Sequence, residues 1–506
     1  MVSIEKILTI AIAIALILVS SSFALSFSSR RRRRRYHPVA GTVFHQLFNF
    51  KRLHHFCTEL ASKYKTYRLL APFHNEIFTA DPSNVEYILK TNFQNYGKGK
   101  YTYSNINDLT GDGIFAVDGL KWRHQRKVAS LEFSRRSLRD YSNTVFKANS
   151  AKLASIVSDA AKSNSIIDVQ ELFMKSTMNS ICQVAFGMEL NSICGNSKEF
   201  SRFLEAFDAA SSLISFRFVD VSWKLKKFLN IGFEAELKRR IEEVNEFLYN
   251  IIRYKIIEAS KNQNVALTKK MDVLSRLLDE KEKDPQNITT KYLRDIILSF
   301  IVAGKDTIAV TLTWFVYMLC KHPSIEAKAF KEVISVTKGL GKSESINEFI
   351  STLTDETHEN MHYLHAVLTE TLRLYPAVPM DPKICFNDDV LPDGYNIRKG
   401  DMVIYLPYAM GRMKFIWGDD AELFRPERWL NDAGVFSPES PFKFTAFQAG
   451  PRICLGKEFA YRQMKMIAAV LLRFFTFELR DKISPKYKIM FTLNIEKGLH
   501  VCARFR

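Results

Sequence analysis

Disulfide and zinc-binding patterns are missing from this sequence. Its 506 residues include only seven cysteines, which are scattered, and no two of them are spaced as Cys-x-x-Cys. A disulfide scaffold or a structural zinc site needs paired or closely spaced cysteines, so the pattern disfavours both. No internal repeat is visible either. We therefore expect the folded part of the chain to lie in a reducing compartment.

Acidic residues are in deficit. The chain has 72 lysines and arginines against 54 aspartates and glutamates, a net charge of +18 that falls to +12 when the six arginines of 30–35 are set aside. The other basic residues are spread along the chain, without the clustered basic and aromatic pattern of a nucleic-acid-binding protein. We expect no nucleic acid. An anionic protein partner or a lipid surface fits this charge better.

The first apolar run is long enough to cross a membrane. Residues 7–27 are almost wholly apolar or small, and as a helix they would span about 31 Å, enough for a bilayer core. Small residues such as Ser22 and Ala24 leave a cleaved secretory signal as the alternative. The arginine run opposes translocation and favours an uncleaved anchor with the remaining chain in the cytosol. We predict an anchor at 1–29 and a basic, Pro- and Gly-containing hinge at 30–41.

Most of the remaining pattern is helical. Residues 137–278 repeat apolar side chains every three or four positions, which predicts helices. We predict a hairpin at 66–81, a short helix at 85–89 and a long loop at 101–120, where Asn and Gly accumulate. Short strands are expected again after Pro376. The fold class is therefore mainly α with a small β-sheet region.

A second long apolar run, residues 296–320, fits either another membrane span or a helix buried in a soluble domain. Lys305 and Asp306 lie near its centre. A charged group at mid-bilayer depth costs about 2.5 to 3.5 kcal/mol on insertion scales, so we favour the buried helix. Pro323 should end it, because proline disfavours the helical conformation of the residue before it.

Cys454 stands in a Gly/Pro loop followed by an amphipathic run. Alone, it could be an inert buried thiol, a nucleophile or a metal ligand. Gly450 and Gly456 allow tight turns and the close approach of a bulky group, and the amides of the following helix could favour a thiolate. A nucleophile would usually need a histidine base nearby, and nothing local supplies one.

The ten residues from Phe447 to Gly456 match Phe-x-x-Gly-x-Arg-x-Cys-x-Gly, which resembles the haem-binding signature of the cytochrome P-450 superfamily. The resemblance implies that family's fold, in one catalytic domain at 42–506. It assigns Cys454 as the axial thiolate ligand of haem iron. It also implies that Phe447 packs beside the ligand and that Arg452 pairs with a haem propionate.

Two further matches lie before this loop. Glu370 and Arg373 are three residues apart on a predicted helix face, which alone could be a weak surface ion pair. The segment 424–429 resembles the Pro-Glu-Arg element of the same family, with Trp429 in place of the commoner Phe. The resemblance implies that Glu370, Arg373 and Arg428 form a buried charge network that fixes the cysteine loop.

The long apolar helix carries another family element, Ala-Gly-Lys-Asp-Thr at 303–307. By resemblance, Gly304 gives room beside the iron, Thr307 hydrogen-bonds dioxygen or its water, and Asp306 admits protons. For Thr307 the structural alternative is a hydroxyl bonded to its own helix carbonyl. Trp122 and Arg126, four residues apart, match a Trp-x-x-x-Arg element that contacts haem propionates; the alternative is a surface cation–aromatic pair.

The resemblance implies a monooxygenase that uses O2, haem b held non-covalently, and electrons from NADPH through a flavoprotein reductase. The stretch 111–119, together with 303–307, resembles plant fatty-acid hydroxylases that oxidise chain ends. We therefore expect a long-chain fatty acid substrate, an endoplasmic reticulum membrane location, and a pocket formed by 103–118, 378–381 and 492–495. The alternatives are another apolar substrate, a haem-thiolate isomerase or dehydratase acting on peroxides, and a haem sensor or carrier.

Overall fold

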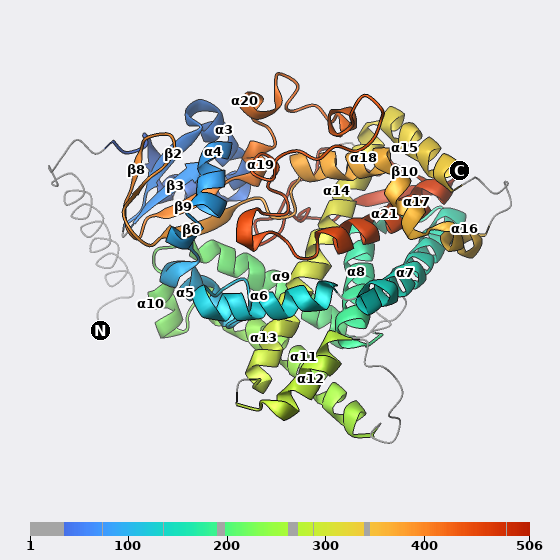
Figure 1. The fold of residues 1–506 in the computed structure, drawn as a ribbon, viewed down its shortest axis with the longest axis horizontal. Coiled ribbons are helices and arrows are strands. Elements are labelled where there is room, and N and C mark those ends of the chain that lie inside the picture. The colour runs from blue at the N-terminus through green and yellow to red at the C-terminus, as the bar shows by residue number, and fades with distance from the viewer. Residues whose placement is uncertain are drawn as a thin grey trace, which may run out of the picture.

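The computed structural model describes residues 35–72, 74–134, 136–189, 198–261, 272–286, 288–337, 345–481 and 483–506. Helices dominate, and the strands gather mainly at one side of the molecule (Figure 1). The helices are α2 (Val43–Phe48), α3 (Leu53–Tyr64), α4 (Pro82–Glu86), α5 (Gly99–Thr110), α6 (Gly119–Ser134), α7 (Arg136–Ser163), α8 (Val169–Phe186), α9 (Lys198–Arg217), α10 (Trp223–Leu229), α11 (Phe233–Lys261), α12 (Val273–Lys283), α13 (Thr290–Ile301), α14 (Thr307–Lys321), α15 (Pro323–Val336), α16 (Ile346–Thr352), α17 (Asp355–Asn360), α18 (His362–Leu374), α19 (Pro407–Met410), α20 (Lys414–Trp417) and α21 (Lys457–Phe474). The strands are β1 (Val39–Thr42), β2 (Thr66–Leu70), β3 (Asn75–Thr79), β4 (Tyr96–Gly97), β5 (Ile166–Asp168), β6 (Asp381–Cys385), β7 (Asp389–Val390), β8 (Asn396–Ile397), β9 (Met402–Tyr405), β10 (Phe475–Leu479) and β11 (His500–Phe505). The expected class, mainly α with small sheets, is confirmed.

The largest sheet joins strands from residues 39–97 to strands from residues 381–405. Its strand order is β1-β2-β3-β9-β6-β4, so blue strands lie beside orange ones in Figure 1. The predicted hairpin is present, with β2 antiparallel to β3 in the register Thr66 opposite Thr79. β10, β11 and β5 form a second sheet. Long-range pairing therefore brings the segment after Pro376 back onto the N-terminal region.

The second apolar run forms the central helix of the fold. α13 continues through a π-helical segment, Val302–Asp306, into α14. This helix is long and apolar enough to cross a membrane, but most of it is buried inside the protein, and it ends before His322 as predicted. The buried-helix interpretation is confirmed. The predicted anchor at 1–29 lies outside the described residues.

The predicted loop at 101–120 is wrong in its first half, where α5 runs from Gly99 to Thr110. Asn and Gly content suggested a loop, but the buried residues Thr102, Ile106 and Leu109 share one helix face. Tertiary burial of that face outweighs the weak helix propensity of asparagine. Gly111 ends the helix at φ +57°, which glycine adopts without steric cost.

Candidate functional site

The cysteine loop is folded back on itself ahead of α21. The backbone N–H of Cys454 donates to the carbonyl of Phe447 at 2.8 Å, and Gly450–Arg452 forms a short 3-10 turn between them. Phe447 packs against Tyr461 of α21 with ring centroids 5.1 Å apart. The loop therefore presents the Cys454 side chain just before the helix N-terminus, whose N-cap is Gly456.

Glycine is required at Gly450 but not at Gly456. A Cβ at Gly450 would lie 1.9 Å from the carbonyl oxygen of Leu89, and its φ is +64°. A Cβ at Gly456 would meet only ordinary contacts, 3.8 Å from the Phe133 ring and 3.9 Å from the Cys454 sulfur. Close approach of the Leu89 backbone thus explains the first glycine of the motif.

The Cys454 side chain is exposed, although burial raises the pKa of its thiol. Both hold if the side chain opens into an internal void. The Gly456 backbone, Arg126 and Lys457 act in the opposite direction and lower that pKa, without outweighing burial. The Gly456 backbone thus acts on the Cys454 pKa in the direction predicted from the sequence, and a bound cation would add to the stabilisation of a thiolate.

Two predicted propionate contacts meet beside this loop. The Arg452 guanidinium lies over the Trp122 ring at 4.5 Å and donates to Asp118 Oδ1 at 2.6 Å. Arg452 Nε is buried and has no hydrogen-bond partner among the described residues. Burial lowers the pKa of Arg126, which lies near enough to Cys454 to feel its charge. Trp122, Arg126, Arg452 and Cys454 therefore belong to one site.

Sequence reasoning missed two lysines in the same cluster. Lys98 Nζ lies 2.5 Å from Asp381 Oδ1 and Lys383 Nζ lies 2.5 Å from Asp381 Oδ2. Burial lowers the pKa of Lys383 to about 7, against the attraction of Asp381. Burial opposes ionisation of Asp381, but the two lysines outweigh it and hold the pKa of that carboxyl below its ordinary range.

These lysines add to the cationic character of the cluster. Lys98, Lys383, Arg126 and Arg452 are four basic side chains, and among the described residues two carboxylates, Asp118 and Asp381, are linked to them. Buried charges need partners. The excess of two basic side chains suits a ligand that carries two carboxylates, as haem does. The one signal in the sequence was the Asp-x-Lys spacing of β6, which places both side chains on one face of the strand.

The π-helical segment of the central helix carries the Ala-Gly-Lys-Asp-Thr element. Ala303 is exposed and Thr307 partly exposed, whereas Gly304, Lys305 and Asp306 between them are buried. The Thr307 hydroxyl donates to the Ala303 carbonyl at 2.6 Å, which is the alternative role given for it above. Gly304 points toward α8 instead of giving the predicted room beside the iron, because a Cβ there would lie 2.8 Å from the Ile181 side chain.

Asp306 is buried and forms an ion pair with Lys305. Lys305 is buried as well, and its Nζ lies 3.4 Å from Asp208 Oδ1 on α9. Burial raises the pKa of Asp306 to about 6, with Lys305 lowering it and Asp208 raising it. The carboxyl can therefore change its protonation state near neutral pH. The Asp208 contact also places α9 over the segment that leads to Thr307.

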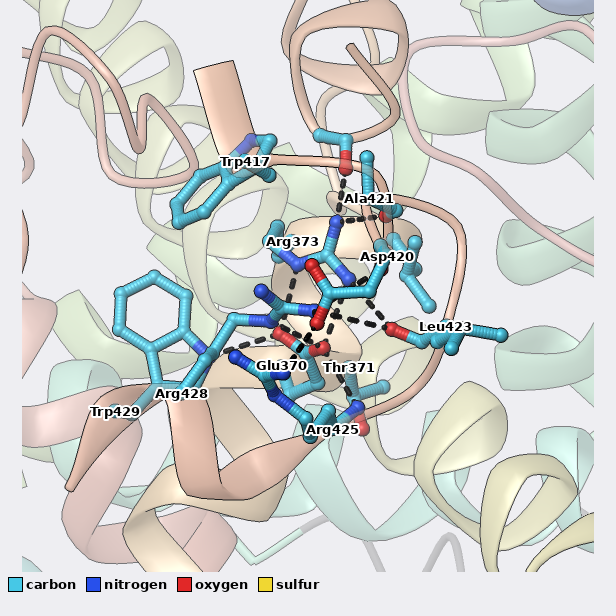
Figure 2. Close-up of polar contacts among 12 residues, drawn as sticks. Glu370, Thr371, Arg373, Trp417, Asp420, Ala421, Leu423, Arg425, Arg428 and Trp429 are labelled. Carbon is cyan, nitrogen blue, oxygen red and sulfur yellow. Dashed lines mark hydrogen bonds and ion pairs between the residues drawn. The ribbon is translucent and has the colours of Figure 1, made fainter. Parts of the chain in front are cut away.

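The predicted charge network is present and complete (Figure 2). The fully buried Glu370 accepts from Arg373 Nε at 2.7 Å and Nη2 at 2.8 Å, and from Arg428 Nε at 2.9 Å. The Arg425 backbone N–H and the Trp429 indole N–H also donate to it, each at 2.9 Å. Trp429, the departure from the commoner Phe, thus provides a fifth donor that phenylalanine lacks.

The network reaches the cysteine loop through aromatic packing. The Trp429 ring lies 4.9 Å from the Phe444 ring at 63°, and Phe444 stands three residues before Phe447 in the sequence. Arg373 also donates to the carbonyl of Ala421, which holds the 420–429 segment against α18. Buried pairing of this kind keeps the loop in one position because moving the segment away from α18 would leave buried charges without their partners.

This mainly helical fold, with a cysteine in a glycine loop beside an excess of basic side chains, fits a haem-thiolate protein. A family model described as Cytochrome P450 matches residues 34–503. The chain therefore belongs to the cytochrome P450 family. It is 49% identical over 480 residues to Cytochrome P450 704C1 of Pinus taeda, covering 92% of each chain.

Other relatives are also plant proteins. Cytochrome P450 704B1 of Arabidopsis thaliana is 45% identical, with 92% of this chain and 93% of the relative covered. Cytochrome P450 86B1 of the same plant is 39% identical over 84% of this chain and 77% of its own. Family membership makes the protein a haem-thiolate monooxygenase that takes electrons from a redox partner and acts on an apolar substrate. The haem, when bound, supplies the activation of dioxygen.

Proposed function

We propose that the protein hydroxylates a long-chain fatty acid at or near its ω end. The observation that carries this proposal is the stretch 111–119 with the Ala-Gly-Lys-Asp-Thr segment, which resembles plant chain-end hydroxylases. Gly111 and Gly113 dock on α13, where a Cβ would meet Asp295 and Ser299 respectively. The turn then presents Phe115, which is 40% exposed. An exposed aromatic side chain in this turn suits contact with an alkyl chain better than with a polar substrate.

Each residue of the site has a separate proposed role. Cys454 would ligate the iron of haem b through its thiolate, and Phe447, Gly450 and Gly456 shape its loop. Arg452 and Arg126, with Lys98 and Lys383, would hold the two carboxylates of haem b, because these basic side chains outnumber their acidic partners; the Trp122 ring supports the Arg452 guanidinium.

In the π-helical segment, Gly304 allows close packing against α8. Thr307 orients dioxygen or its water, and Asp306 holds the proton that Thr307 passes on. Ala303 stands where animal chain-end hydroxylases carry a glutamate that bonds to haem, so the haem is held without a covalent link.

Electrons come from NADPH through a flavoprotein reductase. The exposed side chains of Arg123 and Lys127 on α6, with the partly exposed Lys457 and Arg462 on α21, supply positive charge on the cysteine side of the molecule. An acidic partner would be steered to that side, and its association would weaken as salt is raised.

The catalytic domain lies on the cytosolic face of the endoplasmic reticulum membrane, held by the segment 1–29. Two exposed aromatic side chains support a membrane contact by the folded part: Phe48 of α2 is 86% exposed and Phe228 of α10 is 84% exposed. Leu225 and Leu229 of α10 are also exposed, next to Lys224. Apolar side chains flanked by lysine are typical of segments that enter a lipid interface.

The test is reconstitution of the full-length haem-containing protein with reductase, NADPH and fatty acids of graded chain length. Mass spectrometry should find products that gain one oxygen at or near the methyl end. Haem that is incorporated and reducible, with no hydroxylated fatty acid, would refute the substrate class. Turnover of a fatty-acid hydroperoxide without reductase would favour the isomerase or dehydratase alternative. The Thr307→Ala variant, which lacks the hydroxyl proposed to orient dioxygen or its water, is the matched control for the use of oxygen.

A further inference from the structure

Arg217, the last residue of α9, is the centre of a buried polar junction between three helices. Its Nε donates to Glu234 Oε1 at 2.8 Å and its Nη2 to Glu234 Oε2 at 2.6 Å, near the start of α11. Its Nη1 donates to the Asn105 carbonyl of α5 at 2.8 Å. Arg217 and Glu234 are both buried, so the junction must remain fully paired to be stable.

A second contact ties α9 and α10 to α5 through one carboxylate. Asp108 Oδ2 lies 2.8 Å from Arg217 Nη2 and 2.6 Å from Lys227 Nζ on α10. The Asp108 side chain is 28% exposed and that of Lys227 47% exposed. The Trp223 ring lies under the Arg217 guanidinium at 4.5 Å. Figure 1 shows α5, α9 and α10 close together below the large sheet.

Both sides of the junction are attached to the central helix. α9 reaches the π-helical segment through Asp208 and Lys305, and α11 packs along α9 and against α13. α5 is held separately, through the turn after it: the Asp112 N–H donates to Asp295 Oδ2 of α13 at 2.8 Å. A substrate that enters between α5 and the α9–α11 pair must separate them.

The contacts fall into two groups under such a motion. The bidentate Arg217–Glu234 pair and the stacked rings of Phe203 and Phe247, with centroids 4.2 Å apart, lie within the α9–α11 pair and would survive it. The contacts of Arg217 and Lys227 with α5 would break. We propose that Arg217 and Asp108 are positioning residues that hold the α9–α11 pair on α5 and set the rate at which apolar molecules enter and leave the site.

The proposal rests on the haem site beside Cys454 but not on the fatty-acid class, so the probe is 1-dodecylimidazole, whose imidazole shifts the haem spectrum whatever the natural substrate. The decisive variant is Asp108→Asn in the full-length haem-containing protein, measured by stopped-flow absorbance. If the closed state loses a charge-assisted contact, opening becomes easier with or without ligand. Association and dissociation rate constants should both rise about threefold to tenfold, and Kd should change less than twofold.

Lys227→Met, which removes only the exposed partner, should produce a smaller rise in both rate constants. Glu236→Gln is the matched control, because Glu236 pairs with Arg239 and Arg240 inside α11 and forms no hydrogen bond or ion pair with α5 among the described residues; its rates should equal those of the unmodified protein. Unchanged rate constants in Asp108→Asn, or a change in the dissociation rate constant alone, would overturn the proposed role of Arg217 and Asp108. Absence of any spectral shift in the unmodified protein would overturn the haem site on which the proposal rests.

Discussion

Trp429→Phe tests whether the indole N–H stabilises the buried Glu370. Phenylalanine keeps an aromatic ring between Trp417 and Phe444, which lie 5.5 Å and 4.9 Å from the Trp429 ring, but it removes the 2.9 Å hydrogen bond to Glu370 Oε2. A hydrogen bond to a charged group contributes about 1.5 to 3 kcal/mol. Four donors remain for the four lone-pair sites of the carboxylate, so we expect the low end of that range for the bond.

Trp417→Phe is the matched control. Trp417 belongs to the same buried cluster, and its indole N–H donates to the neutral Met410 carbonyl at 2.9 Å. Loss of a neutral hydrogen bond costs about 0.5 to 1.5 kcal/mol, and the ring atoms lost are the same in both variants. Trp429→Phe should therefore lower the free energy of unfolding by about 0.5 kcal/mol more than Trp417→Phe does.

The assay is urea denaturation of both variants at equal haem saturation, because bound haem adds to apparent stability. The comparison is of midpoints at an unchanged denaturant slope. Trp429→Phe that is no less stable than Trp417→Phe would refute the reasoning, since it would mean that Glu370 is fully satisfied without the indole.

Three further predictions concern the loop and the two walls of the site. Gly450→Ala should abolish haem incorporation, measured by the haem absorbance per protein, because a Cβ would strike the Leu89 carbonyl; normal incorporation would contradict the close approach. Lys383→Met should weaken haem retention, measured by transfer to apomyoglobin, because one of the two excess cations is lost; retention equal to the unmodified protein would show that Lys383 does not pair with a propionate. Asp306 has a pKa raised by burial to about 6, so the unfolded chain ionises first and stability should fall as pH rises from about 4 to about 6, the interval between its ordinary and raised pKa. Asp306→Asn should lose that slope in urea denaturation, and an unchanged slope would assign it to another group.

The cysteine loop was predictable because its chemistry is local. Phe447, Gly450, Arg452 and Cys454 occupy fixed offsets in one loop, so their resemblance to a family motif can be recognised from a short stretch of sequence, and their roles toward haem stay predictions. The central helix was predictable for a related reason, because Lys305 and Asp306 near its centre favour a helix buried in the protein over one that spans a membrane. These features depend on neighbours in the sequence.

The missed features depend on residues that are far apart in the sequence. Lys98 and Lys383 meet at Asp381 because β4 pairs with β6, a contact across almost 300 positions that no periodicity reveals. The role of Trp429 required knowing that its indole faces Glu370, and α5 required knowing which side chains it buries. Tertiary contacts decide these cases, and one sequence does not display them.

The two sides of the site are held by contacts of different kinds, and this difference has a consequence for variation. Glu370 and Arg373 are fully buried, and Gly450 touches backbone, so a change there leaves a charge unpaired or a clash unrelieved and should unfold the loop. Asp108 and Lys227 are partly exposed, so water can replace a lost partner at small cost. Substitutions on the α5 and α9 side can therefore alter which molecules enter, and how fast, while Cys454 stays in place.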